Sequence, residues 1–153
     1  IEYNYQKDLE NYMEFLKEYI DYIIFATLGV MAFVACWCVI ERVLFLRKVD
    51  INSYTSQTEL DNALSYNLTT LYIIYSNAPY VGLLGTVIGI MISFYDMSIS
   101  ATIDVKSVVL GLSLALKATA LGLLVAIPSL IAYNYLFRAV NLISSRYENR
   151  ILS

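Results

Sequence analysis

Three long stretches without charged residues predict three helices that cross a membrane. The stretches lie at 22–40, at 79–95 and, with Lys117 as one interruption, at 107–137. A hydrocarbon core of about 30 Å takes about 20 helical residues, so each stretch is long enough for one crossing or nearly so. Pro79 suits the first position of a helix and predicts the start of the second one. We expect an all-α membrane protein with transmembrane helices at 21–46, 79–97 and 107–137.

Lysine and arginine near the ends of the spans predict the orientation of the chain. One side carries Arg42, Arg47, Lys48, Arg138, Arg146 and Arg150, and the other side carries Lys7, Lys17 and Lys106. Basic residues collect on the cytoplasmic side of membrane proteins. The bias of six against three favours an N-terminus outside and a C-terminus inside. Glu41 and Arg42, which end the first span, are expected to be interfacial anchors.

The first 20 residues predict an amphipathic helix that precedes the first span. Its apolar residues recur at spacings of four and three, at Tyr5, Leu9, Tyr12, Leu16 and Tyr19. Most of the charged residues lie on the other side of this helix. Because tyrosine is common at membrane surfaces, we expect residues 1–20 to form an interfacial helix on the outer side.

The segments between and after the spans are also predicted to be short or helical. Ser56 and Glu59 form a capping-box pattern, and leucines follow it at 60, 64, 68 and 71. Residues 47–78 are therefore predicted to be a short cytoplasmic segment that extends the second span, and residues 98–106 to be the outer connection. A packing face continues the third helix into a cytoplasmic extension at 138–153, with Leu136, Val140, Ile143 and Tyr147.

Composition narrows the classes of function. Apolar residues make up 59% of the 153 residues and charged residues only 15%, which is far from the composition of a soluble domain. The net charge of −3 offers no basic surface for nucleic acid. Histidine is absent, and the two cysteines, Cys36 and Cys38, lie in an apolar run. We expect no metal site, no cofactor and no enzyme activity, because the commonest general base and metal ligand is missing.

Small residues form a stripe on one face of the second span. Its members are Gly82, Gly85, Thr86, Gly89 and Ser93. In lipid, small residues let two helix backbones approach closely, and hydroxyl groups can form hydrogen bonds across the contact. The pattern fits a functional surface, and it also fits ordinary helix packing.

A second stripe of small residues lies on the third span, at Ala115, Thr119, Gly122, Ala126 and Ser129. At about 1.5 Å per residue, Thr86 lies about 15 Å below Asp96, and Thr119 lies about 20 Å below Lys106. We therefore predict that the two threonines share one depth. In one interpretation, the two threonines form the polar lining of a passage or of a docking groove. In the other, each hydroxyl only donates to the carbonyl four residues earlier in its own helix.

The two stripes resemble the ExbB/TolQ/MotA family of proton-driven stators, with the ExbB branch closest. The resemblance rests on the sequences GLLGTVIGIM at 82–91, ATALGLLVAIP at 118–128 and AYN at 132–134. It implies a homo-oligomeric ring, a pentamer, in the bacterial inner membrane, with the N-terminus periplasmic. It also implies an ExbD-like single-span partner that supplies a protonatable Asp, and a TonB-like protein that the complex energises.

The resemblance also implies roles for individual residues. A proton pathway is expected to be lined by Thr86, Thr119, Ser93 and Asn134. Close packing around the partner helix is expected at Gly82, Gly85, Gly89, Ala115, Gly122 and Ala126. The implied function is a proton-channel and stator subunit that uses the proton motive force to energise TonB-dependent outer-membrane transport.

Three features leave alternatives open. Leu114 stands where familiar ExbB members place a Glu. Lys117 lies about 200° around the helix from Thr119, and it is either a member of a proton relay or a charge at a subunit boundary. Pro128 lies inside the third span and predicts a kink, because it frees the carbonyl of Leu124. The alternative functions are a TolQ-like stator of the Tol-Pal envelope-integrity system and a non-conducting oligomeric membrane scaffold.

Overall fold

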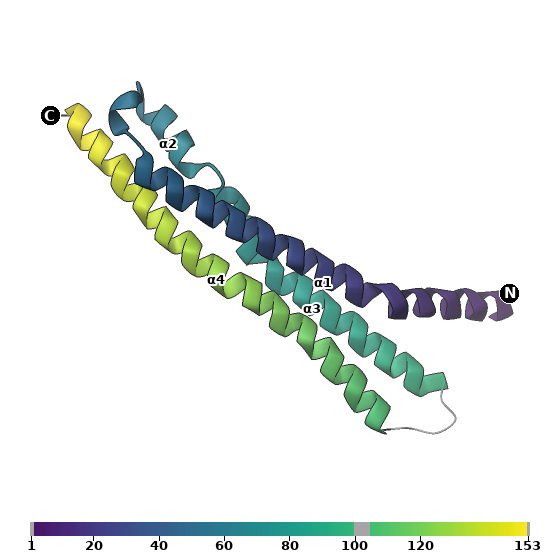
Figure 1. The fold of residues 1–153 in the computed structure, drawn as a ribbon. Helices are drawn as coiled ribbons and strands as arrows, with labels where there is room; N and C mark the ends of the chain where they lie inside the picture. The colour runs from purple at the N-terminus through teal and green to yellow at the C-terminus, as the bar shows by residue number, and fades with distance from the viewer. Residues whose placement is uncertain (1, 100–104, 153) are drawn as a thin grey trace. The chain divides into compact units, whose positions relative to one another are not determined.

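Long helices account for nearly all of the part of the chain that the structure, a computed structural model, describes, which is residues 2–99 and 105–152. The elements are α1 (Glu2–Lys48), a short 3-10 turn η1 (Ile51–Ser53), α2 (Gln57–Ser65), α3 (Leu68–Ile99) and α4 (Val105–Leu152) (Figure 1). Within the described ranges there is no strand, and three helices are long and apolar enough to cross a membrane. The predicted all-α class with three spans is confirmed. Part of the outer connection predicted at 98–106 lies outside the described residues.

Helix α1 joins two elements that the sequence predicts separately. It is continuous from Glu2 to Lys48, so the amphipathic segment and the first span form one helix. The predicted tyrosine stripe is exposed where the structure describes its side chains, at Tyr5, Leu9, Tyr12 and Tyr19. The helical state of this segment is confirmed, and its position on the membrane surface stays a prediction.

The chain folds into two compact units, and each long helix contributes to both. The first consists of Ile1–Val30 and Ala78–Val125, and the second of Met31–Asn77 and Ala126–Ser153. In the second unit the predicted leucine stripe is buried, at Leu60, Leu64, Leu68 and Leu71. It is joined there by Leu136, Val140 and Tyr147, which confirms the predicted packing face of the C-terminal extension.

Helix α2 begins at the predicted cap. The Ser56 hydroxyl accepts a hydrogen bond of 3.2 Å from the Glu59 backbone N–H. The Glu59 carboxylate does not return to Ser56 as in a standard capping box. It accepts hydrogen bonds from the backbone N–H of Thr55 at 3.2 Å and from its hydroxyl at 2.9 Å. The cap satisfies donors that the first turn of a helix leaves unpaired.

The start of α3 corrects one prediction. Helix α3 begins at Leu68, and Pro79 lies inside it rather than at its first position. Burial explains the earlier start, because Leu68, Leu71 and Ile74 are all buried in the second unit. A proline inside a helix removes one backbone hydrogen bond, and packing on either side of it can offset that loss. Asn67, with φ of 63°, makes the break between α2 and α3.

Polar contacts attach the loop region and α2 to the end of α4 in the second unit. The Gln57 side-chain amide donates to the Ser144 hydroxyl at 2.7 Å, and that hydroxyl donates to the Asp61 carboxylate at 2.6 Å. The Tyr147 hydroxyl donates to the Tyr54 carbonyl at 3.0 Å. These bonds fix α2 on α4 by specific partners as well as by apolar burial.

Candidate functional site

The seam between α3 and α4 in the first unit is built from small residues. A methyl group at Gly82 would lie 2.6 Å from the Ala118 carbonyl oxygen, and one at Gly122 would lie 2.7 Å from the Ala78 carbonyl oxygen. A methyl group at Gly89 would lie 2.6 Å from the Ala115 Cβ. Distances below about 3 Å leave no room for a side chain, so the two backbones touch here. The close approach that the two stripes predict is present within one chain.

The neighbours of these residues are the chain's own helices. At Gly85, an added methyl group would meet both the Ala118 Cβ at 2.7 Å and the Ile24 Cδ1 at 2.9 Å, so α1, α3 and α4 meet at this level. Ala126, which was predicted on the same face, is buried in the second unit. The structure thus assigns the centre of the seam to packing within the chain, and contact of these residues with a partner helix stays a prediction.

Thr86 and Thr119 lie at the same depth and are joined by a hydrogen bond between their hydroxyl groups. Thr86 is only 9% exposed. Its hydroxyl also lies 3.1 Å from the Ala115 carbonyl oxygen and 3.4 Å from the Gly82 carbonyl oxygen. The Thr119 hydroxyl lies 3.3 Å from the same Gly82 oxygen. The predicted shared depth is confirmed, and Thr119 is not simply bonded to its own helix.

The threonine pair can be oriented in two ways. Each hydroxyl has one proton to donate, and one of the two protons is used between the threonines. If Thr119 donates to Thr86, then Thr86 donates to Gly82 or Ala115; if Thr86 donates to Thr119, then Thr119 donates to Gly82. The pair is therefore a two-member hydroxyl chain whose direction can reverse, and the Gly82 carbonyl can accept a hydrogen bond in either direction.

The other predicted polar residues are not part of this pair. The Ser93 hydroxyl is buried and donates to its own helix, to the Gly89 carbonyl at 2.9 Å, beside Gly111 of α4. Asn134 is exposed and belongs to the second unit, and Lys117 is exposed while Thr119 lies in the seam. Pro128 lies inside α4, which continues on both sides of it. Roles in a proton pathway, a relay or a kink stay predictions for these residues.

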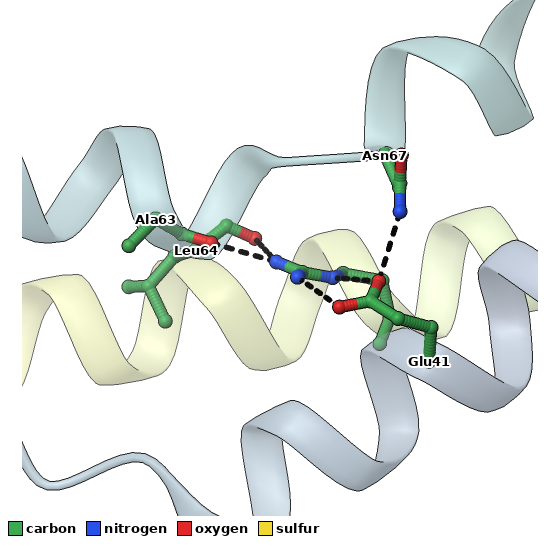
Figure 2. Close-up of polar contacts among 5 residues, drawn as sticks. Glu41, Ala63, Leu64 and Asn67 are labelled. Atoms are coloured by element: carbon green, nitrogen blue, oxygen red, sulfur yellow. Dashed lines mark hydrogen bonds and ion pairs between the residues drawn. The ribbon is translucent and has the colours of Figure 1, made fainter.

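Sequence reasoning missed a buried polar cluster in the second unit, centred on Arg42. Arg42 is only 2% exposed although it was expected to be an interfacial anchor. Its guanidinium donates to both carboxylate oxygens of Glu41, at 2.9 and 2.6 Å, and to the carbonyls of Ala63 and Leu64, at 2.7 and 3.2 Å (Figure 2). Asn67 donates to the same carboxylate at 3.0 Å. The cluster ties the end of α1 to the last turn of α2 and to the break before α3.

The Arg42 cluster satisfies groups that a helix end leaves unpaired. The last carbonyls of a helix have no partner within it, and a cation nearby is favourable at that end. The guanidinium also lies 4.4 Å from the ring centre of Phe45 and 5.7 Å from that of Tyr66. The sequence shows Glu41 and Arg42 side by side, but the other two hydrogen bonds of Arg42 end on backbone carbonyls, so no residue type marks Ala63 and Leu64 as its partners.

Replacing Arg42 with methionine is expected to lower the free energy of unfolding by about 1–3 kcal/mol, because two buried carbonyls and Glu41 would lose their donor. Amide hydrogen exchange should then accelerate in α2. Arg47→Met is the matched control, since Arg47 is exposed in the last turn of the same helix, and its effect should stay within about 0.5 kcal/mol. Equal exchange rates in the two variants would contradict a structural role for the cluster.

Comparison with known proteins gives one consistent result. Residues 46–149 match the MotA/TolQ/ExbB proton channel family. The chain is 58% identical over 136 residues to the biopolymer transport protein ExbB of Helicobacter pylori, covering 89% of this chain and 94% of that protein. It is 49% identical to ExbB of Aquifex aeolicus over 128 residues, or 84% of this chain and 86% of that protein. The Tol-Pal system protein TolQ of Haemophilus influenzae is 42% identical over 89 residues, which cover 58% of this chain and 39% of TolQ.

Proposed function

This chain belongs to the MotA/TolQ/ExbB proton channel family, and from that premise we propose that it is an ExbB-type channel and stator subunit that uses the proton motive force to energise TonB-dependent outer-membrane transport. The chain is a multi-pass membrane protein. The ExbB branch is favoured over TolQ because ExbB of Helicobacter pylori and ExbB of Aquifex aeolicus match over most of their own length at 58% and 49% identity, whereas TolQ of Haemophilus influenzae matches over 39% of its length at 42% identity.

The threonine pair is the observation that carries the proposal. In the first unit its two hydroxyls lie in a seam otherwise made of glycine, alanine and buried apolar side chains. The backbone carbonyls beside the pair accept hydrogen bonds but not protons. The Asp carboxyl of the ExbD-like partner is proposed to donate a proton to one hydroxyl oxygen while the other hydroxyl releases its own proton to water, so the pair passes one proton and keeps two. Each elementary charge that crosses a potential of 100 mV releases about 2.3 kcal/mol, so a few protons supply useful work.

The proposal includes partners and a location. A ring of five copies in the bacterial inner membrane, with the N-terminus periplasmic, would surround a membrane helix of an ExbD-like protein. That partner supplies the protonatable Asp, and a TonB-like protein receives the work. The absence of acidic residues between 22 and 40, 62 and 95 and 107 and 137 of the sequence fits an acid carried by another chain. Ser93 and Asn134 are proposed to extend the pathway on either side of the threonines.

Co-expression with the ExbD-like protein from the same genome tests the proposal. We expect the two proteins to co-purify in detergent, and intact-mass measurement to give several copies of this chain per complex. Proteoliposomes that contain the complex should take up protons when a potential is applied. A complex without the partner, or one without proton uptake, would contradict the channel function and favour the non-conducting scaffold.

A further inference from the structure

Two opposite charges lie at nearly the same depth in the first unit. Gly85, Ala118 and Ile24 meet at one level, and α1 and α4 run in the same direction there (Figure 1). Asp21 lies three residues before Ile24, which is about 4.5 Å along α1, and Lys117 lies one residue before Ala118, which is about 1.5 Å along α4. Their depths therefore differ by about 3 Å, less than one helical turn.

Among the described residues of the first unit, no other charged residue lies as close to Lys117 in depth. Glu18 is a further turn away along α1, and Asp96 and Lys106 lie more than two turns away along α3 and α4. Both Asp21 and Lys117 are exposed, and within the described residues no ion pair joins them. Each is also the last charge before a long uncharged stretch of its helix. An ammonium group that faces hydrocarbon at this point is costly unless it has an anionic partner.

A second copy of the chain can supply that partner. The copies in a ring are related by rotation about an axis normal to the membrane, so each residue keeps its depth from copy to copy. Two charges that match in depth within one chain therefore also match between neighbouring chains. In a ring of more than two copies, the face of one copy that carries Lys117 would meet the face of the next copy that carries Asp21, which is the head-to-tail contact that closes a ring.

We propose that Lys117 of one copy forms an ion pair with Asp21 of the next copy and thereby sets the register of neighbouring subunits. The proposal rests on the ring in the proposed function for the presence of a second copy, but not on proton conduction. It makes Lys117 a residue of the subunit boundary rather than a member of the threonine pathway.

Charge exchange is the first test. Asp21→Lys and Lys117→Asp should each lower the yield of the multi-copy complex at least about tenfold, which corresponds to about 1.4 kcal/mol in association. The double variant Asp21→Lys with Lys117→Asp should restore it. Helix content by circular dichroism distinguishes a lost contact from a misfolded chain. Unchanged assembly in both single variants, or a folded double variant that does not assemble, would overturn the pairing.

Thiol cross-linking is the second test, in full-length protein with Cys36→Ser and Cys38→Ala. An ion pair of a lysine can hold two Cα atoms further apart than the roughly 7 Å that a direct disulfide allows, so the reagent is a bis-maleimide with a spacer as long as a lysine side chain. Asp21→Cys combined with Lys117→Cys should give a ladder of covalent multimers with this reagent in membranes. Asp21→Cys with Leu124→Cys is the matched control, because Leu124 is exposed on the same face of α4 as Lys117 but two turns further from the depth of Asp21, and it should stay monomeric. A cross-link within one chain, or no cross-link in a complex that still contains several copies, would overturn the pairing alone. A wild-type protein with a single copy per complex would overturn the ring as well.

Discussion

Replacing both Thr86 and Thr119 with valine is expected to abolish proton-driven transport while the protein still folds and assembles. Valine keeps the shape of threonine and removes the hydroxyl, so the hydroxyl chain is lost and the seam stays filled. Proton uptake by proteoliposomes should fall at least about tenfold, which is the effect of about 1.4 kcal/mol on a barrier. Stability should change little, since hydrogen bonds between membrane helices contribute about 0.6 kcal/mol on average.

Serine at the same two positions is the control for this experiment. Thr86→Ser and Thr119→Ser keep both hydroxyls and lose only a methyl group, so proton uptake should stay within a few fold of the wild type. Wild-type uptake in the valine double variant would show that the hydroxyls only help the helices to pack. Loss of assembly in that variant would lead to the same conclusion, because the defect would then be structural.

A large loss of stability is expected from Gly82→Ala. The added methyl group would lie 2.6 Å from the Ala118 carbonyl oxygen, 3.0 Å from the Thr119 Cα and 3.2 Å from the Gly122 Cα. All three are backbone atoms that cannot rotate away, so α3 and α4 must separate. Overpacking of this kind costs about 1–3 kcal/mol, and it should also pull the threonine pair apart. Both the melting temperature in detergent and proton uptake should fall.

Gly29→Ala is the matched control, because nothing lies within 4 Å of the position that its methyl group would occupy. Alanine favours the helix over glycine by about 1 kcal/mol, so this variant should be as stable as the wild type or slightly more stable. If Gly82→Ala melts at the same temperature as Gly29→Ala, the close contact between α3 and α4 is not required in the assembled protein.

The three long helices and the cap of α2 could be predicted because each depends on residues that lie close together in the sequence. Uncharged stretches of bilayer length predict helices whatever their neighbours are, and the Ser56 cap depends on only a few adjacent residues. The small-residue stripes predict that some backbone comes close. They carry no information on which helix approaches, and in the structure the approach between Gly82 and Gly122 is made within the chain.

The features that could not be predicted depend on backbone conformation and backbone acceptors. Pro79 has the same appearance in the sequence at a helix start and inside a helix, and only the burial of the residues before it decides between them. Asn67 tolerates a positive φ but does not require one. The Arg42 cluster ends on the carbonyls of Ala63 and Leu64, and every residue has a carbonyl.

The two orientations of the threonine pair have a kinetic consequence. If protons pass along the pair by successive hops, as in the proposed function, each passage would leave both hydroxyls pointing the opposite way. The next proton cannot follow until the two O–H bonds have turned back, so every passage ends with a reset. The Gly82 carbonyl oxygen can accept a hydrogen bond from either hydroxyl, so both orientations are satisfied, while the proton itself comes from and goes to groups outside the pair. In the proposed function, two O–H bonds would have to turn back after each passage, so this pair would carry one proton at a time.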